Sequence, residues 1–152
     1  MLSVWITGAS SGIGEACAYR YAEEGARLVL TSSSVNRLEP VAARCRELGA
    51  TEVNILPCDL TCLDGIDMLT DKAWDAMKGI DIVMLNAGIS QRTNVEDTSM
   101  EMVRKIMEIN YFAPVAIAKR LLPKMVGRGY GKIAVTTSIA GRFGFPLRCG
   151  YS

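Results

Sequence analysis

The sequence contains no histidine. This absence excludes catalytic triads built on an imidazole base and removes one of the usual zinc ligands. Its five cysteines are an odd number without the paired spacing of a metal site. Cys58 and Cys62 would form at most one loose half-site. We therefore expect reduced, mostly buried thiols and no metal ion.

An excess of charge of either sign is also missing. Seventeen basic residues against sixteen acidic ones give a net charge of +1, so nothing in the composition favours nucleic acid or an anionic surface as a partner. No apolar run is long enough to span a bilayer, and no basic segment followed by an apolar signal core begins the chain. We expect a soluble, cytoplasmic chain. Because the first predicted strand begins almost at Met1, the sequence leaves open whether an anchor or leader lies upstream.

What is present is a regular alternation of strand and helix patterns over a length typical of one domain, here residues 1–152, with 49% hydrophobic residues for its core. Short apolar runs predict five strands, at residues 2–7, 27–31, 52–57, 80–85 and 132–137. Helical spacing predicts helices between them, at residues 14–24, 35–48, 64–78 and 99–125. This alternation predicts an α/β fold with one doubly wound, Rossmann-like parallel sheet of order 3-2-1-4-5, whose ligands bind at the carboxyl ends of the strands.

A glycine-rich segment joins the first predicted strand to the first predicted helix. Its three glycines let the chain turn tightly, let backbone approach a charged ligand, and direct the amide groups of a helix N-terminus at phosphate. A glycine loop that merely connects a strand to a helix looks the same, so the turn alone is weak evidence. The cofactor-binding residues predicted here are Thr7, Gly8, Ser10, Ser11, Gly12, Ile13 and Gly14.

Polar residues follow the later strands at the same edge of the predicted sheet. Asp59-Leu60 comes after the third strand, Asn86-Ala87-Gly88 after the fourth, and Ser138 after the fifth. We expect the Gly8 turn and the Asn86 turn to face each other across a crevice between strands one and four. Asp59 is expected to bind an adenine nitrogen through its side chain. Asn86, with Ala87 and Gly88, is expected to position the adenosine side by backbone contacts.

Taken together, six motifs resemble those of the short-chain dehydrogenase/reductase family in order and approximate spacing, across the whole chain. They are Thr7 to Gly14, Asp59-Leu60, Asn86-Ala87-Gly88, Asn110, Ser138 and Tyr151. Within the family, three further segments resemble the branch called dehydrogenase/reductase member 7, namely Ser90-Gln91-Arg92, Pro123-Lys124-Met125 and Gly144-Phe145-Pro146. The resemblance implies an enzyme that transfers hydride between a nicotinamide cofactor and a small-molecule carbonyl or alcohol of lipophilic character. It also implies a homo-oligomeric parent protein.

The resemblance assigns three catalytic residues. Tyr151 matches the tyrosine that protonates the carbonyl oxygen or removes the hydroxyl proton, and Ser138 matches the serine whose hydroxyl stabilises that oxygen. Asn110 matches an asparagine that interrupts a helix and holds a water in a proton relay. Each residue alone also fits an ordinary role: a packed tyrosine near a chain end, a serine in a turn, and a solvated asparagine in a helix. Their joint occurrence with the glycine turn favours the catalytic reading.

The end of the second strand predicts NADP rather than NAD as the cofactor. NAD-selective sites place a carboxylate there, which repels a 2′-phosphate, whereas this chain has a run of hydroxyl residues, Thr31 to Ser34. Ser32 and Ser33 can donate to a phosphate, and Arg37 can approach it. An ordinary helix cap at Ser34 explains part of the same pattern.

One departure from the family stands out. The family's tyrosine is followed four residues later by a lysine that grips the nicotinamide ribose and lowers the tyrosine's proton affinity, and that position would be 155, past Ser152. We therefore expect the amino-terminal part of a longer protein or a truncated product, without its C-terminal strands. Such a chain would hold Tyr151 poorly, expose an apolar edge on strand five, and be inactive. A second reading is a non-catalytic dinucleotide-binding or heterodimer-forming module.

The substrate itself is not readable from these residues. Part of the loop from Gly141 to Cys149 would supply one wall of a pocket. Arg142, Phe143, Phe145 and Leu147 could line that apolar wall or belong to a packed loop, and the pattern does not separate the two.

Overall fold

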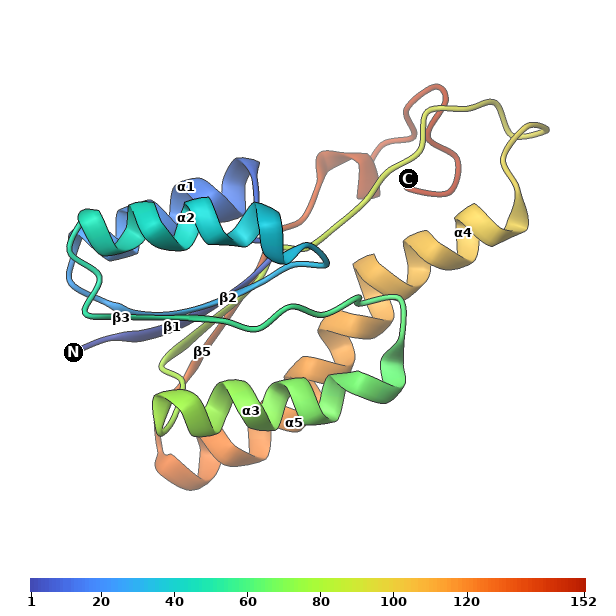
Figure 1. The fold of residues 1–152 in the computed structure, drawn as a ribbon. Helices are drawn as coiled ribbons and strands as arrows, with labels where there is room; N and C mark the ends of the chain where they lie inside the picture. The colour runs from blue at the N-terminus through green and yellow to red at the C-terminus, as the bar shows by residue number, and fades with distance from the viewer.

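A five-stranded parallel sheet runs through the computed structural model, which describes residues 1–152 (Figure 1). The strands are β1 (Ser3–Thr7), β2 (Arg27–Thr31), β3 (Glu52–Ile55), β4 (Ile82–Leu85) and β5 (Lys132–Val135). They lie in the order β3-β2-β1-β4-β5, and every neighbouring pair is parallel. The predicted α/β class, sheet order and switch point between β1 and β4 are therefore confirmed.

Helices cover both faces of the sheet (Figure 1). One face carries α1 (Gly12–Glu23) and α2 (Val35–Glu47), and the other carries α3 (Ile66–Met77) and α5 (Ala113–Arg128). The helix α4 (Met100–Met107) precedes α5 in the chain and extends beyond the sheet toward the C-terminal segment. In the structure no helix combines the length and the apolar character needed to cross a membrane.

The central strands are buried on both faces, as parallel strands between two helical layers must be. All five residues of β1 are buried, and successive side chains alternate between the layers. Trp5 and Val29 pack in the core under α3 and α5, whereas Val4 and Ile6 pack under α1 and α2. Trp5 Nε1 donates to Thr31 Oγ1 at 2.9 Å, which satisfies its buried indole.

The strand β5 differs from β1 because it has a neighbour on one side only. All four of its residues are exposed, and Val135 retains 56% of its accessible surface. The exposed apolar edge expected for this strand is present.

The helix predicted over residues 99–125 is present and is interrupted, as the resemblance implies for Asn110. Ser99 does begin it, accepting from Met102 N at 3.2 Å as the N-cap of α4. A π-helical segment, η2 (Glu108–Phe112), then separates α4 from α5, which ends at Arg128 rather than Met125. The third helix also starts late, at Ile66, because Leu63–Gly65 form a short 3₁₀ turn, η1. After β5, Ile139–Gly141 form a similar turn, η3.

Candidate functional site

The glycine turn after β1 is shaped by close backbone contacts. Gly8 has φ +67°, and a Cβ atom there would lie 2.7 Å from Ala87 Cα. A Cβ on Gly14 would lie 2.3 Å from the carbonyl oxygen of Gly8. Only glycine fits these two positions, because a side chain would push α1 and the Asn86 turn away from β1. The Gly8 and Asn86 turns thus face each other as predicted.

Thr7 and Asn86 tie the carboxyl ends of the strands together. Thr7 is 1% exposed, and its Oγ1 accepts from the backbone N–H groups of Asn86 at 3.0 Å and Ala87 at 3.1 Å. Asn86 Nδ2 donates to Thr7 O at 3.3 Å, and Thr136 Oγ1 donates to Asn86 Oδ1 at 2.9 Å. These bonds link the ends of β1, β4 and β5 and fix the floor of the site.

A cavity of about 820 Å³ opens at this end of the sheet. Every residue assigned to the site from the sequence lines it except Thr7, Gly12 and Gly14. Thr7 lies behind the wall because its hydroxyl is occupied between β1 and β4, and Gly14 lies against the Gly8 carbonyl. Gly12 has φ +57° with open space around it. The structure therefore assigns these three residues to shaping the turn rather than to the cavity surface.

The N-terminus of α1 opens onto the cavity. Ser11 is the N-cap residue, but its side chain makes no capping hydrogen bond. Ser10, Ser11 and Ile13 line the cavity at this point. Because the first N–H groups of a helix have no intrahelical partner and carry a partial positive charge, this corner attracts an anion such as phosphate.

The end of β2 contributes hydroxyl groups and one cation. Ser32 Oγ donates to Ser34 O at 3.2 Å and accepts from Ser34 N at 3.3 Å, so this hydroxyl is already engaged in a turn. Ser34 is the N-cap of α2, as the alternative reading held, although its side chain forms no capping bond. Ser33 and Arg37 are exposed and line the cavity. Arg37 takes part in none of the ion pairs.

Asp59 is held as a carboxylate at the cavity wall after β3, beside the buried Leu60. Its Oδ1 accepts from Thr61 N at 3.0 Å and Thr61 Oγ1 at 2.9 Å. These bonds hold the pKa of Asp59 below its usual value, and the charge of Lys105 lowers that pKa further.

Lys105 is a cavity residue that the sequence reasoning missed. It precedes Asn110 by five positions, and residues five apart do not share one face of a regular α-helix. The spacing therefore carries no signal for Lys105. Only the π-helical break between α4 and α5 reveals that both residues reach the same cavity.

Asn110 lies in that π-helical segment, as expected for an asparagine that interrupts a helix. Its Oδ1 accepts from Ile89 N at 2.9 Å, and its Nδ2 donates to Ile89 O at 2.8 Å. The side chain is therefore bonded to a loop rather than solvated. Gly88 lies close by, since a Cβ there would approach Asn110 Oδ1 to 3.4 Å. A π-bulge of this kind is frequent at functional sites.

Ser138 and Tyr151 reach the same cavity from opposite ends of the C-terminal segment. Ser138 follows β5, and its Oγ accepts from Ala140 N at 3.1 Å as a turn residue. Tyr151 is half-buried, its N–H donates to Arg148 O at 3.0 Å, and the Arg148 guanidinium lies 5.9 Å from its ring centre. The structure thus gives Tyr151 local contacts that the sequence did not lead us to expect.

The residues considered for a substrate wall do not reach the cavity. Gly141 lines it, whereas Arg142, Phe143, Phe145 and Leu147 are exposed and lie outside it. Phe143 keeps 64% of its accessible surface, so neither the apolar wall nor the packed loop describes this stretch.

The cysteines were expected to be mostly buried, and this is wrong. Cys45 is the one buried thiol, and burial raises its pKa to about 11. Cys62 and Cys149 are exposed, and all five cysteines are free. Cys45 lies on the buried, apolar face of α2, so its burial follows from the helix pattern. Cys62 and Cys149 lie in loops, which are usually exposed.

Comparison with solved structures supports this geometry. An alcohol dehydrogenase from the archaeon Thermococcus sibiricus, complexed with 5-hydroxy-NADP, superposes with a TM-score of 0.91 and 32% identity, over 99% of this chain and 64% of that one. A xylitol dehydrogenase bound to NAD⁺ gives a TM-score of 0.92 and 30% identity, over 99% and 58%. This chain thus shares its fold with dehydrogenases solved in complex with 5-hydroxy-NADP or NAD⁺.

Sequence comparison places the chain among the same proteins. The human dehydrogenase/reductase SDR family member 7 is 42% identical over 97% of this chain and 44% of the human protein. A Drosophila melanogaster protein described as dehydrogenase/reductase SDR family protein 7-like is 38% identical over 98% and 47%. The chain spans about half the length of the curated relatives it matches. A short chain dehydrogenase family model matches residues 3–152. The chain therefore belongs to the short-chain dehydrogenase/reductase family, with the predicted resemblance to its member 7 branch.

Proposed function

We propose that these residues form the cofactor-binding and proton-donating part of an NADP-dependent oxidoreductase that acts on a lipophilic carbonyl or alcohol. One observation carries the proposal. The single cavity at the carboxyl end of the sheet brings together the glycine turn, the Asn86 turn, Asn110, Ser138 and Tyr151. These groups are far apart in the sequence. If each had only a structural role, there would be no reason for all of them to line the same cavity.

The residues present fit a dinucleotide. The Gly8 turn and the N-terminus of α1 would hold the pyrophosphate, because side chains are absent where backbone must approach it and the first N–H groups are uncapped. Asp59 would accept from the adenine, and Ser33 with Arg37 would meet a 2′-phosphate on the adenosine ribose. When bound, the nicotinamide would supply or accept the hydride.

In the reducing direction, the Tyr151 hydroxyl would donate its proton to the carbonyl oxygen while carbon receives the hydride. The product is the alcohol, and oxidation reverses both transfers. The Ser138 hydroxyl would donate a hydrogen bond to the same oxygen as negative charge develops on it. Asn110 fixes the loop at Ile89 beside the cavity, where we propose that it holds the water of a proton relay.

The activity belongs, in this proposal, to a longer and homo-oligomeric protein. The lysine implied by the family would lie at position 155, past Ser152. The resemblance implies that this lysine grips the nicotinamide ribose beside the tyrosine. We therefore expect the 152-residue chain to bind the dinucleotide but to reduce no carbonyl. A lysine codon three positions after Ser152 supports the enzyme, and turnover by the purified 152-residue chain would contradict its need for that lysine.

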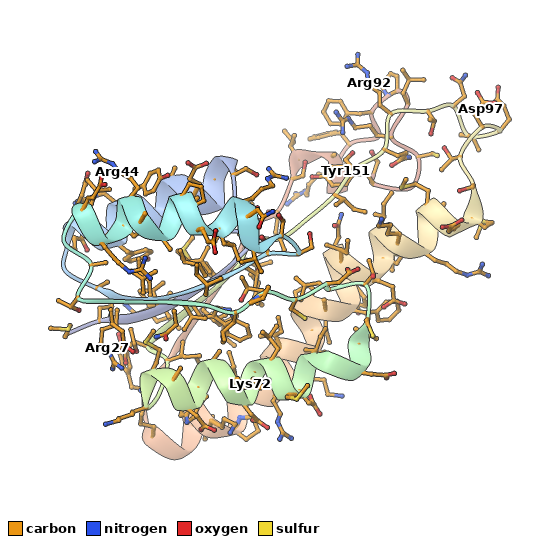
Figure 2. All side chains as sticks on the ribbon, in the orientation of Figure 1. Arg27, Arg44, Lys72, Arg92, Asp97 and Tyr151 are labelled. Carbon is orange, nitrogen blue, oxygen red and sulfur yellow. The ribbon has the colours of Figure 1, made fainter.

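Cofactor choice is tested by titrating the 152-residue chain with NADPH and NADH while following nicotinamide fluorescence. NADPH should bind more tightly. Arg37→Ala should weaken NADPH binding about tenfold through loss of a charged hydrogen bond and leave NADH binding unchanged. Arg44→Ala is the matched control, because Arg44 lies on the same helix, points to solvent and pairs with Glu47 away from the cavity (Figure 2). Tighter binding of NADH would overturn the assignment.

A second candidate is a binding module that pairs with another chain. The exposed edge of β5 favours it, because its unpaired backbone groups can accept a further strand. An assay of the longer protein distinguishes the two proposals. An enzyme would turn over a carbonyl substrate, whereas a binding module would bind the dinucleotide without turnover.

A further inference from the structure

The loop that follows β4 lies along the segment that carries Tyr151. Thr93 N donates to Leu147 O at 3.1 Å, and Thr93 also forms an isolated parallel bridge with Arg148. The Arg148 guanidinium also donates to Ser90 Oγ. Arg92 of this loop and Tyr151 lie at the same end of the molecule in Figure 2.

Gln91 is the buried member of this loop. It is 6% exposed, whereas residues 92–97, which follow it, are exposed. Its side-chain amide faces the backbone N–H groups of Cys149 and Gly150. In the orientation that satisfies both donors, Gln91 Oε1 lies 2.8 Å from Gly150 N and 3.0 Å from Cys149 N. A buried amide without such partners costs free energy, so these two bonds account for a glutamine at this position.

The same loop is anchored at its other end by a second side-chain amide. Asn110 holds both backbone groups of Ile89, two residues before Gln91. The contacts therefore run from the π-helical segment through Ile89 and Gln91 to Cys149 and Gly150, directly before Tyr151. Side-chain hydrogen bonds and short stretches of backbone thus connect Asn110 with Tyr151, two residues of the proposed catalytic set.

We propose that Gln91 is a positioning residue for the reaction, which rests on the proposed function. Its buried amide holds the backbone immediately before Tyr151 and so sets the direction from which the phenol enters the cavity. A general acid acts only within hydrogen-bond reach of the oxygen it protonates, and a displacement of about 1 Å can cost roughly 10²-fold in rate. Gln91 itself touches neither substrate nor cofactor in this proposal.

The contact is tested first by amide hydrogen exchange in the 152-residue chain. Gln91→Met keeps the size of the side chain but removes the acceptor, and the N–H groups of Cys149 and Gly150 should then exchange at least about tenfold faster. Gln91→Glu keeps an oxygen in reach and should restore their protection. Exchange at Trp5, in the buried strand β1, serves as the control for global unfolding. Unchanged exchange in Gln91→Met would overturn the proposal.

The consequence for the reaction is tested in the longer protein. Gln91→Met should lower kcat about 10-fold to 10²-fold and leave the KM for NADPH unchanged, and Gln91→Glu should recover most of the rate. A normal kcat in a Gln91→Met protein whose Cys149 and Gly150 amides exchange quickly would overturn the positioning role. A wild-type longer protein without turnover would instead overturn the proposed function and the catalytic consequence with it. The exchange experiment would still decide whether Gln91 holds the segment.

Discussion

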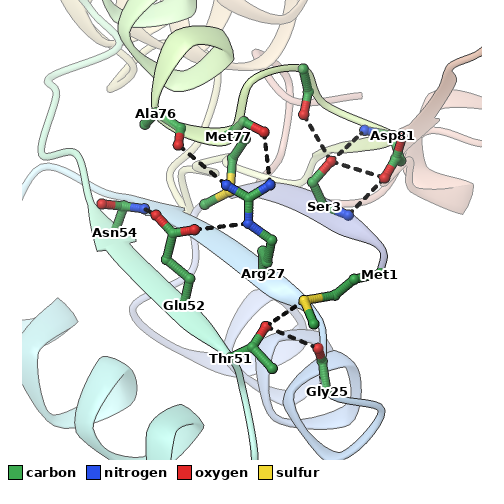
Figure 3. Close-up of polar contacts among 11 residues, drawn as sticks. Met1, Ser3, Gly25, Arg27, Thr51, Glu52, Asn54, Ala76, Met77 and Asp81 are labelled. Carbon is green, nitrogen blue, oxygen red and sulfur yellow. Dashed lines mark hydrogen bonds and ion pairs between the residues drawn. The ribbon is translucent and has the colours of Figure 1, made fainter.

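The two ends of the sheet use similar polar residues in opposite ways. At the amino end, charged and polar side chains bind one another and nearby backbone groups (Figure 3). Arg27 Nε lies 2.8 Å from Glu52 Oε2, and its terminal nitrogens donate to Met77 O at 2.9 Å and Ala76 O at 3.4 Å. One guanidinium thereby joins β2, β3 and the last carbonyls of α3.

Ser3 and Asp81 form a second closed set at the amino end (Figure 3). Ser3 N donates to Asp81 Oδ2 at 2.8 Å, Asp81 N donates to Ser3 Oγ at 3.0 Å, and Ser3 Oγ donates to Gly79 O at 2.8 Å. Arg128 pairs with Asp81 Oδ1 at 3.1 Å. This set connects the starts of β1 and β4 to the end of α5.

At the carboxyl end, by contrast, some polar groups have no partner within the chain. The N-cap side chain of α1 is unbonded, Arg37 has no ion-pair partner, and Ser138 and Tyr151 line one cavity. Parallel strands direct all their following loops to one edge, so ligand chemistry gathers there and the other edge is free to be satisfied internally. The comparison teaches that the amino edge satisfies its polar groups internally, whereas the carboxyl edge combines bonded side chains such as Asn110 with groups that have no partner in the chain, such as the Arg37 guanidinium.

The largest expected effect lies at the carboxyl end. In the longer protein, Tyr151→Phe should remove the transferable proton and keep the ring, lowering kcat by roughly 10²–10⁴-fold while NADPH affinity stays the same. Tyr130→Phe is the matched control, because Tyr130 lies at the other end of the sheet, just before β5, and should keep full activity. Steady-state kinetics decide the matter, and an active Tyr151→Phe enzyme would remove Tyr151 from the mechanism.

The second effect concerns the shape of the carboxyl end. Gly14→Ala should reduce the free energy of unfolding by about 1–3 kcal/mol, because the new Cβ would meet backbone at 2.3 Å and overpack the turn. Dinucleotide affinity should fall as well. Gly65→Ala, where a Cβ meets nothing within 4 Å, is the control for both measurements. Urea unfolding and NADPH titration of the two variants test the prediction. Equal stability would show that α1 can shift without cost.

The third effect belongs to the amino end and should separate stability from binding. Asp81→Ala removes the acceptor of Ser3 N and the partner of Arg128, and should lower the free energy of unfolding by about 1–2 kcal/mol. NADPH affinity should not change, because the set lies at the opposite edge from the cavity. Asp75→Ala, an exposed position outside these contacts, is the control. A parallel loss of NADPH affinity would break the contrast between the two ends.

The smallest effect is a pH dependence at Glu52. Hydrogen bonds from Asn54 and then Arg27 hold the pKa of Glu52 below its ordinary value of 4.5. The folded state therefore gains stability from the ionised carboxylate above that value and loses it as the pH falls through the lower folded pKa.

Because Glu52 is partly exposed, Glu52→Gln should destabilise the chain by less than about 1 kcal/mol at pH 7. This difference should disappear at pH values below the folded pKa. Thermal unfolding at a series of pH values measures it, with Glu39→Gln, outside the ion pairs, as control. A difference that persists in acid would assign the effect to packing rather than to charge.

Particular residues show how far sequence reasoning reached. The order of the strands and the meeting of Gly8 with the Asn86 turn were predictable, because each depends on local patterns and on the handedness of βαβ connections. Lys105 and Gln91 were not identified as functional. Lys105 lies in α4, before the π-helical segment that carries Asn110, and only the folded chain shows that both residues line one cavity. Gln91 acts on Cys149 and Gly150, which are far from it in the sequence.

By itself, the sequence determined the α/β class, the sheet order, the family and most of the residues that face the cavity. Apolar periodicity is a local property of the chain and suffices for the class and the sheet order, whereas the family and the catalytic residues followed from the resemblance of six short motifs. The tertiary structure decided which hydroxyls and amides are still open, that Thr7 and Gly14 support the turn from behind, and that the Gln91 amide meets the backbone N–H groups of Cys149 and Gly150. These depend on which groups meet across the fold, because a hydrogen bond between distant segments leaves no periodic trace in the sequence.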